Sequence, residues 1–252
     1  MIAAASLAMQ QRNLETIAGN LANISTPGYK ATRLSFAEVV RRTSASGADG
    51  ANGPIAPGGV AVAGTDKDFS TAGDLKPTGS AMDLAINGRG FLEVSLADGS
   101  RAFTRGGSLT INKDSMLTTQ AGLVLKPEIS VPADATRINI TPEGRVMVQV
   151  PGHAGELELG RLELAAFVNP GGLKALGDGL YVPTGESGEA LAVRAGEDGI
   201  GTLAQGALEQ SNVQMNNEMV ALMKAQRAYE LSARVLQVSD GIMAATNELL
   251  RR

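Results

Sequence analysis

Apolar residues recur at a seven-residue spacing along the C-terminal part of the chain. Positions 212–252 contain no proline and one glycine, Gly241. This period predicts a long helix that packs along its length on other helices, and the alternative is a long core helix of an ordinary enzyme. Ser211 and Gln214 have the spacing of a capping box, which predicts the helix start. The series consists of Met215, Leu222, Tyr229, Leu236, Met243 and Leu250, with the small residues Ala225, Ser232, Ser239 and Thr246 three positions further on.

The N-terminal residues 1–22 show the same spacing at Leu7, Leu14 and Leu21, with Ile17 and Ile24 between them. Pro27 and Gly28 then predict a turn. A secretory signal is the competing interpretation. A basic start is lacking, the apolar run is short and the helical period continues past it, so the segment is predicted to be a mature amphipathic helix. The two terminal helices are expected to pair, which makes the rest of the chain an insertion.

The middle of the chain changes from small residues to strand patterns. Gly, Ala, Pro and Ser make up 22 of the 40 residues from 41 to 80, which predicts a mobile or extended segment that buries little. The run "FLEVSLADGSRAFT" places Asp98-Gly99 between two strand-like segments, a strong hairpin signal. "RVMVQV" alternates strictly, and "ELELGRLELAAFV" changes phase at Gly160, which predicts a β-bulge.

Together these patterns predict an α+β fold. The N- and C-terminal helices pair as a coiled-coil-like stem, and an antiparallel β-rich domain, a small barrel or sandwich, is inserted between them. An extended Gly/Ala-rich connector joins the two. The expected parts are a helical stem (1–25 with 211–252), a connector (26–75 with 175–210) and a β-rich outer domain (76–174).

Composition excludes several classes of protein. The net charge is −4 with a pI near 5.2, and no basic cluster is longer than Arg41-Arg42, so no nucleic-acid partner is expected. No apolar run is long enough for membrane insertion. Cysteine is absent, which excludes a disulfide framework and a thiolate metal site.

No catalytic chemistry emerges from the motifs. His153 is the only histidine and lies in a glycine-flanked turn, which argues against a metal site or a triad. "NGRGF" (87–91) precedes a strand and lacks the later residues of a phosphate loop, so it is interpreted as a turn. Asp83, Glu93 and Asp98 are assigned to solvated strands and turns. We therefore expect no enzyme activity, no cofactor and no metal.

Four segments resemble the bacterial flagellar rod and hook axial proteins of the basal body. They are "IAGNLANISTPGYK" (17–30), "TAGDLKPTGSAMDLAINGRGFLEV" (71–94), "FVNPGGLKALGDGLYVPTGESGEA" (167–190), and "QGALEQSNV" (205–213) with "AQRAYE" (225–230). The resemblance implies a helix pair that forms the inner wall of a hollow tube, with β domains outside. It also implies export through the flagellar type III apparatus without a cleaved signal.

Within this family, residues 125–146 and 167–190 look most like the distal rod members, and the proximal rod and hook members are alternatives. Gly19 stands where the family usually has Asn, and the first helix is shortened. The implied role is a structural subunit of a torque-transmitting shaft in the basal body, which spans the periplasm. Implied partners are copies of the chain in a helical tube, other rod proteins, hook protein, ring proteins and the export apparatus. Outside the family, the alternative is a β-rich carbohydrate-binding module.

Two sets of residues are expected to carry this role. The predicted subunit-interface residues are Leu7, Leu14, Ile17, Leu21, Leu222, Tyr229, Leu236, Met243 and Leu250. The family-motif residues are Asn20, Leu21, Ala22, Asn23, Thr26, Gly28, Tyr29, Ser211, Asn212, Val213, Gln226, Arg227 and Tyr229. Because helices without tertiary cover are marginal in water, residues 1 to about 30 and 211–252 are expected to order only on assembly, around a core of about 40–200.

Overall fold

A computed structural model of the chain describes residues 2–42, 55–152, 155–197 and 199–249. The chain divides into two compact units. Unit 1 consists of Met1–Ala22, Thr32–Asp66 and Gln214–Arg252, and unit 2 of Asn23–Ala31 and Lys67–Val213. The two parts of unit 2 are therefore separated in the sequence by Thr32–Asp66, which belongs to unit 1. The three-part division expected from the sequence stays a prediction.

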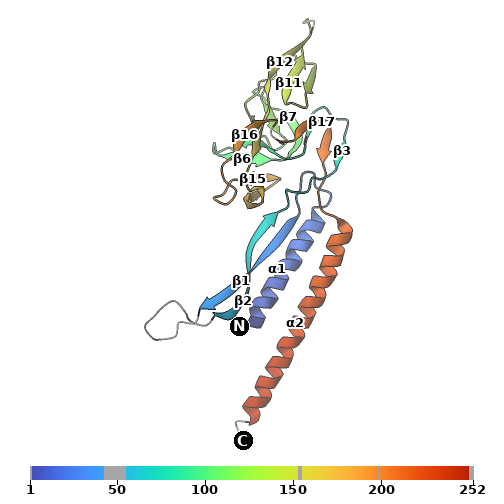
Figure 1. Ribbon diagram of the computed structural model, residues 1–252. Helices are drawn as coiled ribbons and strands as arrows, with labels where there is room; N and C mark the ends of the chain where they lie inside the picture. The colour runs from blue at the N-terminus through green and yellow to red at the C-terminus, as the bar shows by residue number, and fades with distance from the viewer. Residues whose placement is uncertain (1, 43–54, 153–154, 198, 250–252) are drawn as a thin grey trace, which may run out of the picture. The chain divides into compact units, whose positions relative to one another are not determined.

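Unit 1 contains two helices and a two-stranded sheet. Helix α1 spans Ile2–Ala22 and helix α2 spans Met215–Leu249. Strand β1 (Thr32–Arg42) pairs with β2 (Ile55–Lys67). The helices lie side by side (Figure 1). They run antiparallel, because Gln10 Nε2 donates to Ser232 Oγ at 3.3 Å and Asn20 Nδ2 donates to Glu218 Oε2 at 3.5 Å.

The end of α1 confirms the sequence prediction, whereas the start of α2 does not. Helix α1 stops at Ala22, before the turn in which Thr26 N donates to Asn23 O. The capping box at Ser211 is wrong, because α2 begins at Met215 and Ser211 Oγ accepts a hydrogen bond from Val213 N at 3.3 Å instead. Residues 211–213 are not helical because unit 2 binds them: Asn212 N donates to Tyr29 O.

Unit 2 is built from short antiparallel strands. An eleven-stranded sheet has the order β14-β15-β6-β5-β9-β8-β7-β4-β17, with β13 pairing β5 and β16, while β10-β11-β12 form a second sheet and β18-β3 a third. The strands are β3 (Leu75–Pro77), β4 (Asp83–Asn87), β5 (Phe91–Ser95), β6 (Arg101–Thr104), β7 (Gly106–Ile111), β8 (Leu117–Thr119), β9 (Val124–Lys126), β10 (Arg137–Ile140), β11 (Arg145–Gln149), β12 (Glu156–Arg161), β13 (Glu163–Ala166), β14 (Lys174–Gly177), β15 (Leu180–Val182), β16 (Leu191–Arg194), β17 (Thr202–Gln205) and β18 (Ala207–Glu209), with a 3-10 turn at Pro170–Gly172.

The strand patterns read from the sequence are confirmed. β5 and β6 form the predicted hairpin around Asp98-Gly99, with Ser95 opposite Arg101. In the β11–β12 pair the register skips Leu159, the neighbour of Gly160, which is the expected bulge. The "NGRGF" segment is a turn between β4 and β5, where Gly88 and Gly90 have positive φ angles of 117° and 128°.

The core of unit 2 has an aliphatic and an aromatic part. The aliphatic part includes Leu84, Leu92, Val94, Leu117 and Leu164, all with 0% exposure. In the aromatic part, ring centroids lie 4.9–6.1 Å apart with edge-to-face geometry, which adds to the stability gained by burial. It consists of Phe69, Phe91, Phe103, Phe167 and Tyr181.

The α+β class is thus confirmed, with a β-rich domain between two terminal helices. Closure of the strands into a small barrel or sandwich and coiled-coil pairing of the helices stay predictions. In the Gly/Ala-rich stretch, residues 55–67 belong to β2, and residues 43–54 lie outside the described residues. His153 also lies outside them.

Candidate functional site

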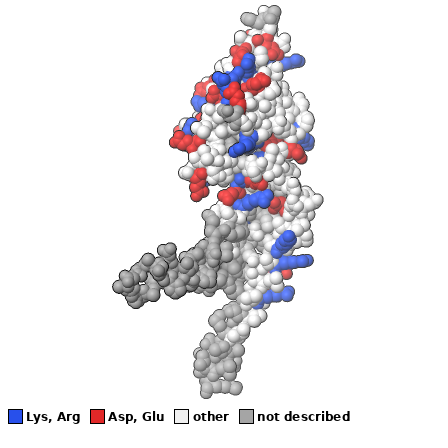
Figure 2. Space-filling view, in the orientation of Figure 1, with Lys and Arg blue, Asp and Glu red and all other residues white. Residues whose placement is uncertain are grey.

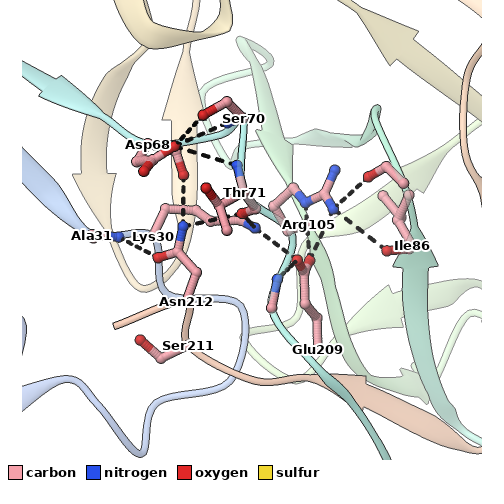
Figure 3. A network of polar contacts seen from close by, with 12 residues as sticks. Lys30, Ala31, Asp68, Ser70, Thr71, Ile86, Arg105, Glu209, Ser211 and Asn212 are labelled. Carbon is pink, nitrogen blue, oxygen red and sulfur yellow. Dashed lines mark hydrogen bonds and ion pairs between the residues drawn. The ribbon is translucent and has the colours of Figure 1, made fainter. Parts of the chain in front are cut away.

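Three charged side chains are buried together in unit 2 (Figure 3). Glu209 Oε1 accepts from Lys30 Nζ at 2.7 Å, and Glu209 Oε2 accepts from Arg105 Nε at 3.0 Å. Their exposed fractions are 1% for Lys30, 5% for Arg105 and 3% for Glu209. We call these three residues the buried charge cluster. It joins the turn after α1, the β6–β7 connection and the end of β18.

Main-chain groups supply further hydrogen-bond partners to each member of the cluster. Glu209 Oε1 also accepts from Gly73 N at 3.0 Å, and Lys30 Nζ donates to Thr71 O at 3.0 Å. The Arg105 guanidinium donates to the carbonyls of Gly90 at 2.5 Å and Gly88 at 2.7 Å, in the β4–β5 turn. Hydrogen bonds and ion pairs of this kind offset the cost of burying charged groups.

The cluster contains two cations and one carboxylate. Burial lowers the pKa of Lys30 from its ordinary value, and the attraction of Glu209 opposes that shift. The folded state therefore releases the Lys30 proton at a lower pH than the unfolded chain does. At pH values below the folded pKa the buried ammonium lowers the stability of unit 2, and this loss of stability shrinks as the pH rises towards 10.5. Glu209 holds the cluster together, because its carboxylate bonds to both Lys30 and Arg105.

Asn212 ties three segments of unit 2 together. Its Oδ1 accepts from Ala31 N at 2.7 Å, and its Nδ2 donates to Asp68 O at 2.9 Å and Thr71 O at 3.1 Å. Nearby, Lys67 Nζ donates to Lys30 O at 3.2 Å and lies 4.3 Å from the centroid of the Tyr29 ring. Both ends of unit 2 therefore meet at one polar site.

In unit 1, Asn20 has a comparable role. It is 2% exposed, its Oδ1 accepts from Thr32 N at 2.8 Å and its Nδ2 donates to Thr32 O at 2.9 Å. The amide thus mimics a neighbouring strand and fixes where β1 begins, twelve positions after Asn20.

Large apolar side chains on α2 are exposed. Leu231, Val235, Val238 and Ile242 are 62%, 65%, 63% and 62% exposed, and we call them the apolar row. Their alternating spacing of four and three residues places them on one face of the helix. In Figure 2 the part of unit 2 that is visible carries intermingled acidic and basic side chains.

The predicted interface residues fall into three groups. Ile17 is buried at 6%, and Leu7, Leu14, Leu21 and Leu222 are half-buried. Tyr229 is 39% exposed. The side chains of Leu236 and Met243, and all of Leu250, lie outside the described residues. The face of α2 that is buried is marked by Ala225, one of the predicted small positions, at 6% exposure.

The predicted motif residues also divide. Asn20 and Val213 are buried, while Gln226 and Arg227 are exposed on α2. Gly28 has a φ angle of +70°, and its N–H donates to Glu209 O at 2.7 Å. Tyr29 and Asn212 belong to the polar site, and Ser211 directly precedes Asn212. Asn23 and Thr26 form the turn after α1, which ends with Leu21 and Ala22.

Sequence reasoning missed Lys30, Arg105 and Glu209. Lys30 and Glu209 lie inside segments 17–30 and 205–213, which resemble the axial family. A charged residue among the polar and apolar residues of these segments was the signal that could have revealed them. Arg105 carries no comparable signal, because it follows a hairpin strand in which an exposed arginine is ordinary.

Of the three carboxylates considered for catalysis, the solvated position expected from the sequence is wrong for Asp83, which is 7% exposed because it bonds to two hydroxyl groups. Asp83 accepts from Thr78 Oγ1 at 2.5 Å and Ser108 Oγ at 2.7 Å, and Glu93 lies 3.8 Å from Arg101. Hydrogen bonds from Ser100 lower the pKa of Asp98 in its turn. Among the described residues, no group of three or more His, Cys, Asp or Glu is placed to hold a metal ion. None of the described helices is long and apolar enough to cross a membrane.

Comparison with known families gives three matches along the chain. Residues 2–30 match the family described as flagella basal body rod protein, and residues 85–148 match the flagellar hook protein FlgE/F/G D1 domain. Residues 204–249 match the flagellar basal body rod FlgEFG protein C-terminal family.

Individual relatives align over nearly the whole chain. The flagellar basal-body rod protein FlgG of Caulobacter vibrioides is 38% identical, over 98% of this chain and 97% of its own length. FlgG of Borreliella burgdorferi is 36% identical, over 99% of this chain and 97% of its own. The rod protein FlgF of Caulobacter vibrioides is 34% identical, over 90% and 86%.

Proposed function

The chain belongs to the family of flagellar basal-body rod proteins, and on that premise we propose that it is a distal rod subunit that polymerises helically into a hollow shaft. This shaft transmits torque from the motor to the hook. The FlgG relative from Caulobacter vibrioides is more similar, at 38% identity, than the FlgF relative from the same organism, at 34%. That difference, with the resemblance of residues 125–146 and 167–190 to distal rod members, supports the distal position.

The single observation that carries polymerisation is the apolar row on α2. Fully burying a side chain such as Leu, Val or Ile stabilises a protein by roughly 1.5–3 kcal/mol, and Leu231, Val235, Val238 and Ile242 leave most of that gain unused. Exposed apolar side chains aligned on one helix face mark a surface that binds another protein.

The occupant that we propose is a helix of a second copy of the chain. The four-and-three spacing suits another helix, since side chains at this spacing interlock with a helical partner. Helix α2 has 35 residues and α1 has 21, so about 20 Å of α2 extend beyond the length that α1 is able to cover. In this arrangement α1 and α2 of each copy form a coiled-coil-like pair within the inner wall.

The remaining properties follow from membership of this family. We propose a non-enzymatic subunit of the basal body, exported without a cleaved signal, whose neighbours are other rod proteins and hook protein. The relatives are named as rod proteins, which supports the structural role. Contact with basal-body ring proteins belongs to the same proposal.

A charge on the apolar row tests this function. Val238→Lys places an ammonium group in the proposed helix contact, and Gln237→Lys places the same charge on the adjacent, exposed position of a different face. We expect Val238→Lys to abolish filament formation by electron microscopy and light scattering, and Gln237→Lys to retain it, with equal circular dichroism of both monomers. Normal filaments from Val238→Lys would overturn the proposed contact.

The distal position has a separate test. Basal bodies isolated from cells lacking the gene are expected to show a short proximal rod without distal rod or hook. Basal bodies with a complete rod would contradict the assignment.

A further inference from the structure

We propose that residues 28–31 and 209–212 form a mechanical joint of unit 2, loaded in shear when force reaches unit 2 through the helices. We call this pair of segments the parallel joint. The inference rests on the proposed function, in which each subunit of a rotating shaft sustains force. Its evidence is the direction and the burial of contacts within unit 2.

The two segments run in the same direction. Gly28 N donates to Glu209 O at 2.7 Å, and Asn212 N donates to Tyr29 O at 3.4 Å. The later residue of one segment therefore bonds to the later residue of the other, as in a parallel strand pair. Two side-chain contacts strengthen the joint: the Lys30–Glu209 ion pair at 2.7 Å, and the hydrogen bond from Ala31 N to Asn212 Oδ1 at 2.7 Å.

The direction decides how the joint responds to force. Residues 28–31 follow α1, which ends at Ala22, and residues 209–212 precede α2, which begins at Met215. Tension applied through both helices therefore pulls the two parallel segments at opposite ends. All the contacts between them are then stretched together, whereas pulling at the same end would break them one after another. A joint loaded at opposite ends therefore resists a higher force than a joint with the same number of bonds that is pulled at one end.

Burial adds to this resistance. Lys30 and Glu209 are 1% and 3% exposed, so water is not at hand to replace their contact as it lengthens. Arg105 connects Glu209 to the carbonyls of Gly88 and Gly90, which passes the force on to the β4–β5 turn. The joint is thereby anchored in the main sheet of unit 2.

The chain offers a matched pair of variants for the test. The Asn212 amide makes three hydrogen bonds to main-chain groups, one across the joint to Ala31 N and two to Asp68 O and Thr71 O outside it. The Gln205 amide also makes three, to Ile140 N, Ala81 O and Ile138 O, away from the joint. Asn212→Ala and Gln205→Ala thus remove the same number and type of bonds. Glu209→Gln is unsuitable here, since it leaves two buried cations and threatens folding.

The absence of cysteine allows force to be applied at chosen sites by single-molecule tweezers. With handles on the exposed positions Ala18→Cys and Asn216→Cys, the force enters through the helices. With handles on Asp114→Cys and Glu143→Cys, in turns of unit 2, it bypasses the joint. All measurements use the full chain as a monomer, so a failure of assembly leaves this test unaffected.

Through the helix handles, we expect Asn212→Ala to raise the unfolding rate at a given force about tenfold, and Gln205→Ala about twofold or less. Through the turn handles, we expect the two variants to have similar effects. Equal acceleration by both variants through the helix handles, or the same effect of Asn212→Ala in both geometries, would overturn the proposal. The two proposals can fail separately. If Val238→Lys forms no filaments while Asn212→Ala and Gln205→Ala unfold at equal rates through the helix handles, the proposed function is supported and the joint is rejected.

Discussion

The two units of the molecule differ in how their large apolar side chains are arranged: unit 2 encloses a core and exposes scattered residues such as Val168 and Leu191, whereas α2 in unit 1 exposes an aligned row. In unit 2 the aliphatic core is closed, with Leu84, Leu92 and Leu164 at 0% exposure. In unit 1 the second half of α2 exposes Leu231, Val235 and Ile242 by more than 60% each. Unit 2 even buries the three charged side chains of the buried charge cluster, which demands a well-packed surrounding. A chain that completes one unit and leaves the other uncovered is suited to assembly through the uncovered one.

Limited proteolysis of the monomer is expected to show the largest difference between the units. The exposed end of α2 opens locally at little cost, whereas cleavage inside unit 2 requires unfolding that costs about 5 kcal/mol or more, a rate ratio of at least about a thousand. Trypsin should therefore cut first in α2, for example at Arg234. The protected fragment should run from about residue 23 to residue 213, because Lys30 and Glu209 belong to the same buried cluster.

That boundary differs from the core of about 40–200 expected from the sequence, because Asn23–Ala31 and the residues up to Val213 belong to unit 2. Mass spectrometry of the first stable fragment identifies its ends. Equal protection of α2 and unit 2 in the monomer would mean that the helices are already covered, and the contrast between the units would disappear.

Removing the charge of Glu209 is expected to weaken unit 2 strongly. Glu209→Gln leaves Lys30 and Arg105 as two buried cations without their carboxylate, and breaking a buried pair costs about 3–5 kcal/mol. Urea unfolding, followed by tyrosine fluorescence and far-ultraviolet circular dichroism, measures this loss. Glu186→Gln, at an exposed turn, is the control and should change stability by less than about 0.5 kcal/mol.

Alkaline unfolding tests the burial of Tyr181 in the aromatic part of the core. Burial raises the pKa of Tyr181 to about 12, from an ordinary value of 10. Above pH 10 the unfolded chain releases this proton and the folded one keeps it, so stability present below pH 10 is lost as the pH rises towards 12. The loss reaches roughly 2–3 kcal/mol, at 1.36 kcal/mol per pKa unit.

Tyr181→Phe removes this contribution. The variant should therefore lose less stability than the parent chain between pH 10 and pH 12, as measured by urea unfolding at each pH. Parallel curves for the two proteins over that range would show that Tyr181 ionises freely and that this side of the core is open to water.

The smallest effect is expected at Ser211, where the units meet in the chain. A helix cap would lose about 1 kcal/mol on substitution by alanine. Because α2 begins at Met215 and Ser211 accepts only from Val213 N at 3.3 Å, we expect Ser211→Ala to change stability by less than about 0.5 kcal/mol. A loss near 1 kcal/mol, with reduced helix content, would restore Ser211 as the cap.

Local sequence patterns predicted several elements of the fold correctly. The end of α1, the β5–β6 hairpin and the bulge beside Gly160 follow from turn residues and alternation within a few positions. The start of α2 did not follow, because Asn212 bonds to Tyr29 and Ala31 across the chain and this outweighs the local capping signal.

The candidate site was less accessible to sequence reasoning. Lys30 and Glu209 are separated by 179 positions, and an ion pair leaves no period in the sequence. Phe69 shows the same difficulty: it lies in a stretch expected to bury little, yet its ring is 5.1 Å from Phe91 and 5.0 Å from Tyr181. Contacts of this kind follow from the fold as a whole.

The buried charge cluster also bears on recombination between related genes. Lys30 and Glu209 are encoded far apart, and Arg105 lies between them in the sequence. A crossover between codons 30 and 209 takes Lys30 and Glu209 from different parents, so a hybrid keeps the stability of the cluster when both parents encode the same trio and loses part of it when they differ. Between genes that differ in the trio, the cluster therefore acts as a barrier to recombination.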